Sequence, residues 1–185
     1  ALAAGNTVIW KPASDTPLLS VAIARLLADA GLPDGVLNLV LGPGSMGAAM
    51  VADERVDGVT FTGSVPVGQR IRDVVTARNG RVQLELGGHN PCIVFDDADL
   101  DLAVAGAVGG AMGATGQKCT ATRRVIAVGD VHDELLEQMA TAVEALQVGD
   151  GSKDGTEIGP LVSAGARTEV AEAVDAAIAE GAKAV

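Results

Sequence analysis

The sequence predicts an α/β protein, in which an open parallel sheet with helices on both faces is followed by part of a second α/β domain. Apolar runs of strand length alternate along the chain with segments of helical periodicity. The connections between them are short and contain glycine or proline, as expected of strand–helix–strand units with parallel strands. Gly87-Gly88 interrupts this alternation. We therefore expect residues 1–86 to form one partial domain and residues 87–185 another.

The first expected domain contains four strands and three helices in a Rossmann-like order. Strands are predicted at residues 7–10, 36–41, 58–62 and 81–86. Helices are predicted at residues 17–30 and 65–77, with a short helix that includes residues 48–50. Asp15-Thr16 offers a helix cap before Pro17, and Asn79-Gly80 ends the third helix. Apolar and polar residues alternate along the last strand, so Glu85 should project away from its apolar face.

The second expected domain continues the pattern of strands and helices. Strands are predicted at residues 92–95 and 124–128, and helices at residues 100–114, 133–146 and 163–179. Asp96, Asp97 and Asp99 precede the first of these helices, where negative charge is favoured. Loops are expected at residues 115–120 and 149–159.

Composition limits the kinds of partner. The net charge is −11 and the basic residues form no patch, which disfavours nucleic acid and anionic membranes. No apolar run approaches the roughly 18 residues of a membrane span. His89 and His132 are isolated, so no metal site is expected. Two cysteines without a secretory signal indicate a reducing, cytoplasmic location.

The opening segment, Ala1-Leu2-Ala3-Ala4-Gly5, has neither an initiator methionine nor the charged region of a signal peptide. It is typical of the end of a helix that turns into a strand. We expect the chain to be an internal fragment of a larger protein.

Cys119 is the first candidate for chemistry. It follows a glycine-rich helix and lies in the polar segment Gly116-Gln117-Lys118-Cys119-Thr120. A nucleophilic thiol needs partial exposure and stabilisation of its thiolate, which such a loop can provide. A free cysteine is also commonly buried and inert, so this residue alone leaves both interpretations open.

Glu85 is the second candidate. It lies between Leu84 and Leu86 at the end of a strand, directly before two glycines. A carboxylate placed at a domain boundary could act as a general base. A solvent-facing glutamate without a role fits the same residue.

Two glycine-containing turns could hold a phosphate. In the turn at residues 61–64, backbone amides at a helix start could bind a pyrophosphate, or Ser64 could simply cap the helix. Residues 42–47 match G-x-G-x-x-G. In dinucleotide-binding proteins with this motif, an acidic residue follows the next strand. That strand ends in Phe61-Thr62 with no acid nearby. A tight turn therefore explains residues 42–47 better.

The order and spacing of these motifs resemble the aldehyde dehydrogenase superfamily, and the resemblance covers essentially all 185 residues. The segments that carry it are Lys11-Pro12-Ala13-Ser14, Phe61-Thr62-Gly63-Ser64, Leu84 to Gly88, Asn90-Pro91, Gly116 to Cys119 and Ile158-Gly159-Pro160-Leu161.

The resemblance implies an NAD(P)-dependent, hydrolytic aldehyde dehydrogenase. Cys119 matches the cysteine that attacks the aldehyde carbon to give a thiohemiacetal and, after hydride transfer, a thioester. Glu85 matches the glutamate that activates the hydrolytic water and can activate the thiol. The oxyanion would be stabilised by the Cys119 N–H and by an asparagine upstream of Ala1. Because this chain lacks that asparagine, we expect the isolated chain to have negligible activity.

The resemblance also places NAD or NADP across the first three strands. Lys11 and Ser14 match contacts to the adenosine ribose. The other expected contacts, from the adenine side to the nicotinamide end, are Gly44, Gly63, Ser64, Val67, Leu86 and Gly87. Strict NAD users of the family often carry glutamate at the position of Ser14. The neutral serine beside Lys11 predicts that NADP is accepted.

The substrate implied by resemblance is a semialdehyde. Residues 116–122 resemble the subgroup that oxidises 2-oxoglutarate semialdehyde (2,5-dioxopentanoate), and succinate-semialdehyde enzymes share Lys-Pro-Ala-Ser at residues 11–14. Strand alternation would point Arg123 and Arg124 in opposite directions, so neither is assigned as a carboxylate clamp. His89 departs from the usual lysine and receives no role. The complete enzyme is expected to be a homodimer or homotetramer.

Two alternatives accompany this interpretation. A CoA-acylating semialdehyde dehydrogenase shares the fold, but those relatives generally lack the base at the position of Glu85. A non-catalytic nucleotide-binding module would also be an acidic α/β domain, and it would keep Cys119 buried.

Overall fold

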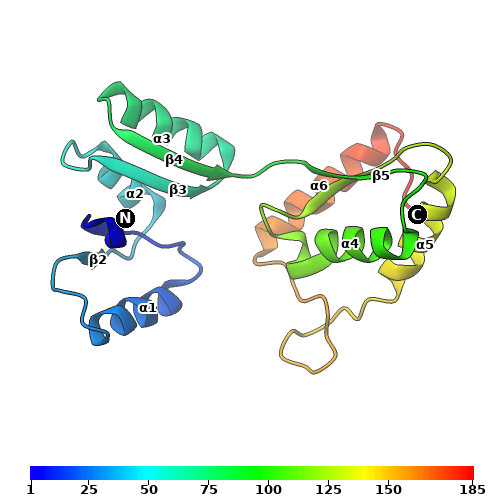
Figure 1. Cartoon of the computed structure of the whole chain (residues 1–185), viewed down its shortest axis with the longest axis horizontal. Coiled ribbons are helices and arrows are strands. Elements are labelled where there is room, and N and C mark those ends of the chain that lie inside the picture. The colour runs from blue at the N-terminus through cyan, green and yellow to red at the C-terminus, as the bar shows by residue number, and fades with distance from the viewer. The chain divides into compact units, whose positions relative to one another are not determined.

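A computed structural model describes all residues, 1–185, in two compact units, Ala1–Leu86 and Gly87–Val185. Each unit combines parallel strands with helices (Figure 1), which confirms the predicted α/β class. Within the open parallel sheet predicted for residues 1–86, the strands pair two by two, β1 with β2 and β3 with β4. The first two strands have only three residues each, and such short strands offer few backbone groups for pairing on a second edge.

Unit 1 opens with a short 3-10 turn, η1 (Leu2–Ala4), and then alternates strands and helices. Its strands are β1 (Val8–Trp10), β2 (Leu37–Leu39), β3 (Gly58–Gly63) and β4 (Arg81–Leu86). Its helices are α1 (Pro17–Asp29), α2 (Gly44–Ala52) and α3 (Val65–Ala77). The strand predicted at residues 36–41 is shortened to β2. Val36 and Val40 still share one backbone hydrogen bond each with residues of β1, at 2.8 and 2.9 Å.

β3 and β4 form a parallel pair with six matched positions, and α3 packs on both strands (Figure 1). Exposed and half-buried residues alternate along both strands, which confirms the predicted alternation and the outward direction of Glu85. Val75 of α3 is completely buried. Gly68 allows α3 to lie close to β4, because a β-carbon at this position would overlap the Leu86 side chain.

Arg78, the residue after α3, forms hydrogen bonds with three backbone carbonyls of residues 51–56. Its guanidinium donates to the carbonyls of Val51 (2.9 Å), Asp53 (3.0 Å) and Val56 (2.8 Å). These carbonyls belong to the end of α2 and the turn that leads into β3. In the same turn, hydrogen bonds from Arg55 hold the pKa of the Asp53 carboxyl well below its usual range.

Substituting Arg78 should destabilise unit 1. Arg78→Ala removes three hydrogen bonds from a half-buried charged donor, and we expect a loss of about 1.5–3 kcal/mol in the free energy of unfolding. Arg78→Lys should recover only part of it, because an ammonium cannot reproduce the planar fork of donors. Urea unfolding followed by circular dichroism measures both changes. Arg70→Ala, at an exposed position within α3, is the control and should leave the midpoint unchanged.

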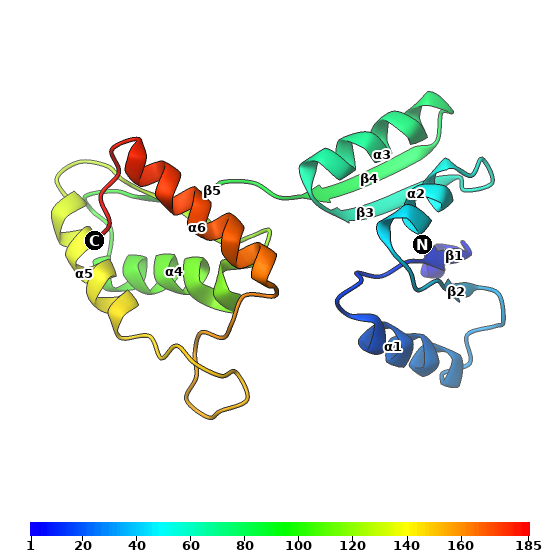
Figure 2. The same cartoon turned by 180° about the vertical axis from the view of Figure 1, so that it is seen from behind.

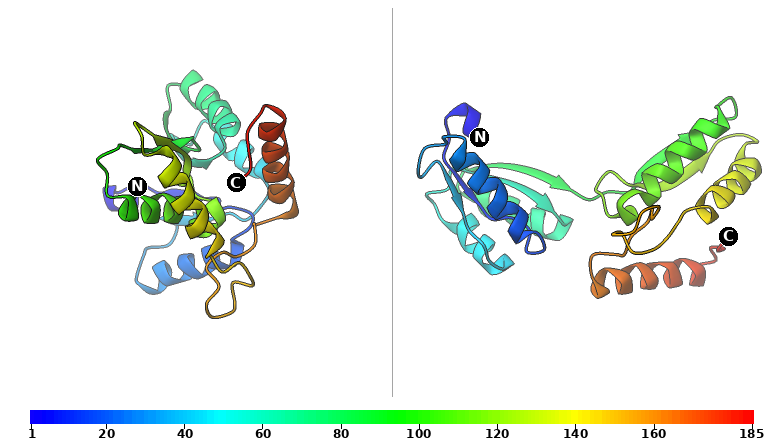
Figure 3. Two further views of the ribbon diagram at one scale, coloured as in Figure 1. Left: turned by 90° about the vertical axis from the view of Figure 1, so that its right-hand side faces the viewer. Right: turned by 90° about the horizontal axis from the view of Figure 1, so that it is seen from below.

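Unit 2 contains two strands and three α-helices. Its elements are β5 (Asn90–Val94), α4 (Leu100–Met112), the 3-10 turn η2 (Gly113–Gly116), β6 (Thr122–Ala127), α5 (His132–Glu144) and α6 (Ala164–Ala179). α5 packs beside α4, as two further views in Figure 3 show. The core of this unit is a cluster of buried residues from these elements and the turn before α5: Val94, Val104, Val108, Val131 and Leu135.

The ends of the helices in unit 2 follow the sequence closely. The Asp99 side chain caps α4 by accepting from the N–H of Leu102 at 3.1 Å, and Ser163 caps α6 in the same way through Ala166. A long segment without helix connects α5 to α6 and loops away from the helices (Figure 2). A single bridge between Val148 and Ile158 closes its base. No helix of the structure is both long enough and apolar enough to cross a membrane.

Candidate active site

Parallel pairing of β3 and β4 brings two predicted site segments to the same sheet edge. Thr62 pairs with Glu85 and Gly63 with Leu86, so the turn into α3 and the candidate base both lie at the carboxyl ends of the strands. Glu85 is exposed and shares its face of β4 with Gln83. This edge is where ligands bind in open parallel sheets.

The turn from β3 into α3 leaves polar groups free for a ligand. Ser64 occupies the N-cap position of α3, but its hydroxyl makes no capping hydrogen bond. Pro66 follows within the first turn, and the N–H groups of a first helical turn have no intrahelical partner. The alternative in which the Ser64 side chain caps the helix is therefore wrong. Val67 lies half-buried in this first turn.

The Lys11 side chain is tied to the backbone between β1 and α2. Its ammonium donates to the carbonyls of Pro12 (2.8 Å) and Gly42 (3.2 Å). Gly47 of α2 makes room for it, because a β-carbon there would stand 3.2 Å from the Lys11 Cε atom. Lys11 thus brings its positive charge to the carboxyl ends of β1 and β2.

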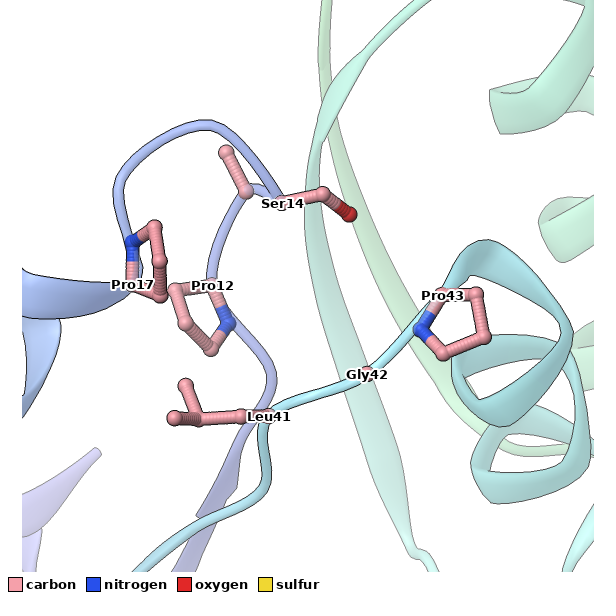
Figure 4. A pocket seen from close by; sticks show the side chains of 7 residues that line it. Pro12, Ser14, Pro17, Leu41, Gly42 and Pro43 are labelled. Atoms are coloured by element: carbon pink, nitrogen blue, oxygen red, sulfur yellow. The ribbon is translucent and has the colours of Figure 1, made fainter.

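An open pocket of about 260 Å³ lies beside Lys11, between the segments that follow β1 and β2. Figure 4 shows Pro12, Pro17 and Leu41 grouped on one side and Pro43 on the other, with Ser14 at the rim. Pro43 is the N-cap residue of α2, which starts at Gly44. None of the residues that line the pocket is acidic. They are Pro12, Ala13, Ser14, Pro17, Leu41, Gly42 and Pro43.

The two cysteines of unit 2 occupy different environments. Cys119 is exposed, in the loop between η2 and β6, whereas Cys92 is half-buried in β5 and packs against the core cluster. The alternative in which Cys119 is buried is therefore wrong. None of the hydrogen bonds within the chain uses the Cys119 N–H as donor. That donor remains available to a ligand next to the thiol.

The segment before Cys119 has an unusual backbone and is tethered from the side. Ala114, Thr115 and Gly116 all have positive φ, at 52°, 59° and 67°, a region that a β-branched threonine rarely adopts. The Thr115 hydroxyl donates to the Gly159 carbonyl at 3.2 Å, and the Gln117 side chain accepts from the Val162 N–H at 2.8 Å. The loop predicted at residues 115–120 is therefore an ordered turn.

Asn90 holds the segment after Cys119, a role that sequence reasoning missed. Its carboxamide donates to the carbonyls of Cys119 at 2.7 Å and Ala121 at 2.9 Å. The only sequence signal was its place in the Asn90-Pro91 motif, since these contacts span 29 and 31 residues.

A β-bulge follows directly. Asn90 pairs with Thr122 and Pro91 with Arg124, so Arg123 is the extra residue. Arg123 and Arg124 are both exposed, and the bulge breaks the alternation on which their predicted opposite orientation rests. Arg124 donates to the His89 carbonyl at 2.9 Å, so its guanidinium is engaged by the backbone.

The predicted site residues fall into two groups. Lys11, Ser14, Gly44, Gly63, Ser64, Val67, Glu85 and Leu86 belong to unit 1, and Gly87 and Cys119 belong to unit 2. No group of three or more potential metal-ligating side chains occurs in the structure.

Sequence comparison finds one family over the whole chain: the aldehyde dehydrogenase family matches residues 1–185. The α-ketoglutarate semialdehyde dehydrogenase of Haloferax volcanii is 46% identical over 183 residues, which are 98% of this chain and 38% of that protein. This chain spans about 38% of the length of the curated relatives it matches first.

Solved structures agree with this fold. An NADP-dependent enzyme of E. coli superposes with a TM-score of 0.96 at 40% identity, over 100% of this chain and 39% of that one. The betaine aldehyde dehydrogenase of Staphylococcus aureus, solved in complex with NAD+, superposes with a TM-score of 0.95 at 37% identity, over 99% of this chain and 37% of that one.

Proposed function

This chain belongs to the aldehyde dehydrogenase family, and we propose that it carries the nucleophile and base of a longer enzyme that oxidises an aldehyde to a carboxylic acid with NAD+ or NADP+. The observation that carries this proposal is the match of one family to all of residues 1–185, because that range includes both Cys119 and Glu85. The exposed thiol of Cys119 supports it.

In the proposed reaction, the Cys119 thiolate attacks the aldehyde carbon and forms a thiohemiacetal. The Cys119 N–H is unused within the chain, which supports a role as donor to the oxyanion. NAD+ or NADP+, when bound, would supply the hydride acceptor, so that oxidation at this carbon would leave a thioester on Cys119. Glu85 removes a proton from water, the water attacks the thioester, and the acid departs as the thiol is restored.

The residues present fit a dinucleotide. The uncapped start of α3, with the free Ser64 hydroxyl, suits a pyrophosphate, because helix N-termini favour anions. The pocket beside Lys11 suits an adenosine, with apolar walls and one hydroxyl at the rim. We assign contacts to Lys11, Ser14, Gly44, Gly63, Ser64, Val67, Leu86 and Gly87. NADP is included because no carboxylate lines the pocket to repel a 2′-phosphate.

Ser14→Glu should shift the preference between cofactors. A carboxylate at this rim would repel the 2′-phosphate of NADP, and we expect kcat/KM for NADP to fall roughly tenfold to hundredfold while that for NAD is kept. Steady-state kinetics with both cofactors measure the shift. Glutamine has the shape of glutamate without its charge. Ser14→Gln is therefore the control and should retain kcat/KM for NADP. Comparable kcat/KM for the two cofactors in Ser14→Glu would argue against this assignment.

We propose a semialdehyde as substrate, with 2-oxoglutarate semialdehyde or succinate semialdehyde as the first choices. Residues 116–122 and their resemblance to the 2-oxoglutarate semialdehyde subgroup support this choice, as does the similarity to the Haloferax volcanii protein. Arg124 is engaged by the His89 carbonyl, so we assign no carboxylate clamp to it.

The organisation of the complete enzyme is part of the proposal. Residues 1–86 form part of the NAD(P)-binding domain, and residues 87–185 form part of the catalytic domain. The division of the structure at Leu86 supports this boundary. We propose a cytoplasmic homodimer or homotetramer, and the two free cysteines fit a reducing compartment.

The deciding experiment is an assay of the complete enzyme with a panel of aldehydes, with NAD or NADP, in the presence and absence of CoA. Formation of a free carboxylic acid without CoA supports the hydrolytic function. Product that forms only with CoA would favour the acylating alternative, and the exposed Glu85 at its strand end counts against that outcome. Binding of the dinucleotide without turnover of any aldehyde would favour a non-catalytic module.

A further inference from the structure

The Asn90 side chain contacts the backbone on both sides of Thr120, the residue that follows Cys119. It is the first residue of β5, and its carboxamide nitrogen lies 2.7 Å from the Cys119 carbonyl oxygen and 2.9 Å from that of Ala121. An asparagine side chain has two N–H donors on one nitrogen, and both are used here. Rotating the carboxamide by half a turn would set its oxygen against two carbonyl oxygens, so the orientation is determined.

The place of Asn90 in the sheet explains why this contact is needed. The backbone ladder between β5 and β6 starts at the pair Asn90–Thr122 and is disturbed at once by the bulge at Arg123. Residues 119–121 therefore lie beyond the regular pairing. The Asn90 side chain extends the connection to β5 over these residues, and the buried Ala121, only 2% exposed, anchors their far end.

The segment before Cys119 is fixed by other side chains. Gln117 accepts from the Val162 N–H, and Thr115 donates to the Gly159 carbonyl. The three left-handed residues 114–116 adopt a conformation that persists only where the surroundings hold it. Cys119 thus lies between two points of attachment, and Asn90 supplies the side-chain hydrogen bonds to residues 119–121.

We propose that Asn90 is a positioning residue for Cys119, which acts by fixing the Cys119–Ala121 backbone and so the direction of the thiol and of the neighbouring N–H. The expected effect on kcat rests on the proposed function, because Cys119 is the nucleophile of that reaction. A displacement of about 1 Å at a reacting group can lower a rate a hundredfold, so a tether of this kind is sufficient to affect turnover.

Asn90→Asp is the sharpest test, because it keeps the size and shape of the side chain but replaces two donors with an acceptor facing two carbonyls. Asn90→Ala removes the donors without adding repulsion. We expect both variants to lower kcat of the complete enzyme roughly tenfold to hundredfold, with the KM values for aldehyde and cofactor unchanged. A role in filling space alone would leave Asn90→Asp similar to the wild type.

Hydrogen–deuterium exchange of the complete enzyme gives a readout independent of activity. In both variants the peptide covering residues 113–121 should exchange about tenfold faster, as expected for the loss of two hydrogen bonds, while a peptide from α4 keeps its protection. Asn38→Asp is the matched control, because Asn38 of β2 also donates from its carboxamide to a backbone carbonyl, that of Gly35 at 2.8 Å. It should leave residues 113–121 unchanged.

The outcomes separate this inference from the proposed function. Unchanged exchange at residues 113–121 in both Asn90 variants overturns the inference, whatever the activity. Faster exchange with wild-type kcat also overturns it, since Asn90 would then stabilise the loop without positioning the thiol. A wild-type enzyme that oxidises no aldehyde refutes the proposed function, and the exchange data still decide whether Asn90 holds the Cys119 loop.

Discussion

Cys119→Ser should abolish aldehyde oxidation by the complete enzyme, with a loss in kcat/KM of at least about a thousandfold. The reason is chemical: a serine hydroxyl is a far weaker acid than a thiol and therefore a poorer nucleophile without strong activation by a base, whereas a cysteine reacts as its thiolate. The measurement is the absorbance of the reduced cofactor formed with a semialdehyde. Cofactor binding should be retained, because none of the assigned contacts to the cofactor uses the Cys119 side chain.

The matched control for this prediction is Cys92→Ser. Both cysteines are free and both belong to unit 2, but Cys92 is half-buried against the core while Cys119 is exposed. Cys92→Ser should keep activity, with at most a modest loss of stability. Iodoacetamide should label Cys119 first in the native protein and inactivate the enzyme in parallel, and aldehyde with cofactor should protect it. Activity that survives in Cys119→Ser, or labelling that leaves the enzyme active, would contradict the assignment of the nucleophile.

Glu85→Gln should slow steady-state turnover by roughly a hundredfold to ten-thousandfold, the range of general base catalysis. The amide cannot accept a proton from water, so the thioester on Cys119 should accumulate. A rapid first turnover followed by a slow steady state is therefore expected in stopped-flow measurements of reduced cofactor. Hydroxylamine should restore much of the rate, because it attacks a thioester without help from a base.

Gln83→Ala is the control for Glu85→Gln. Gln83 lies two residues earlier on the same exposed face of β4, so its replacement tests for general damage to this strand. It should leave both the burst and the steady state unchanged. A Glu85→Gln enzyme with wild-type turnover would remove Glu85 from the mechanism.

Much of unit 1 could be predicted because local signals coincide there. α3 runs from Val65 to Ala77 and β4 from Arg81 to Leu86, as the sequence predicts. Pro66 suits only the first turn of a helix, and Asn79, with a φ of 60°, adopts the left-handed conformation of a helix end. Between such markers, the two-residue alternation of β4 indicates which side chains face outward. These signals are all contained within a few residues of chain.

Capping was less predictable, because several side chains can suit one cap. Thr16 and Ser64 both occupy N-cap positions, yet neither side chain accepts a capping hydrogen bond. Asp99 does cap α4. Threonine, serine and aspartate all belong to the residue types that favour N-caps, so the difference depends on the side-chain geometry reached after folding.

The sequence by itself determined the α/β class, the order of the elements, the family and, through its motifs, Cys119 and Glu85 as candidates for catalysis. Local periodicity and motif spacing are sufficient for these conclusions. Only the tertiary structure decided that Cys119 is exposed, that Arg123 is a bulge residue, and that Asn90 holds the turn after Cys119. The last two depend on contacts between residues some 30 positions apart, and only folding of the chain brings such residues together.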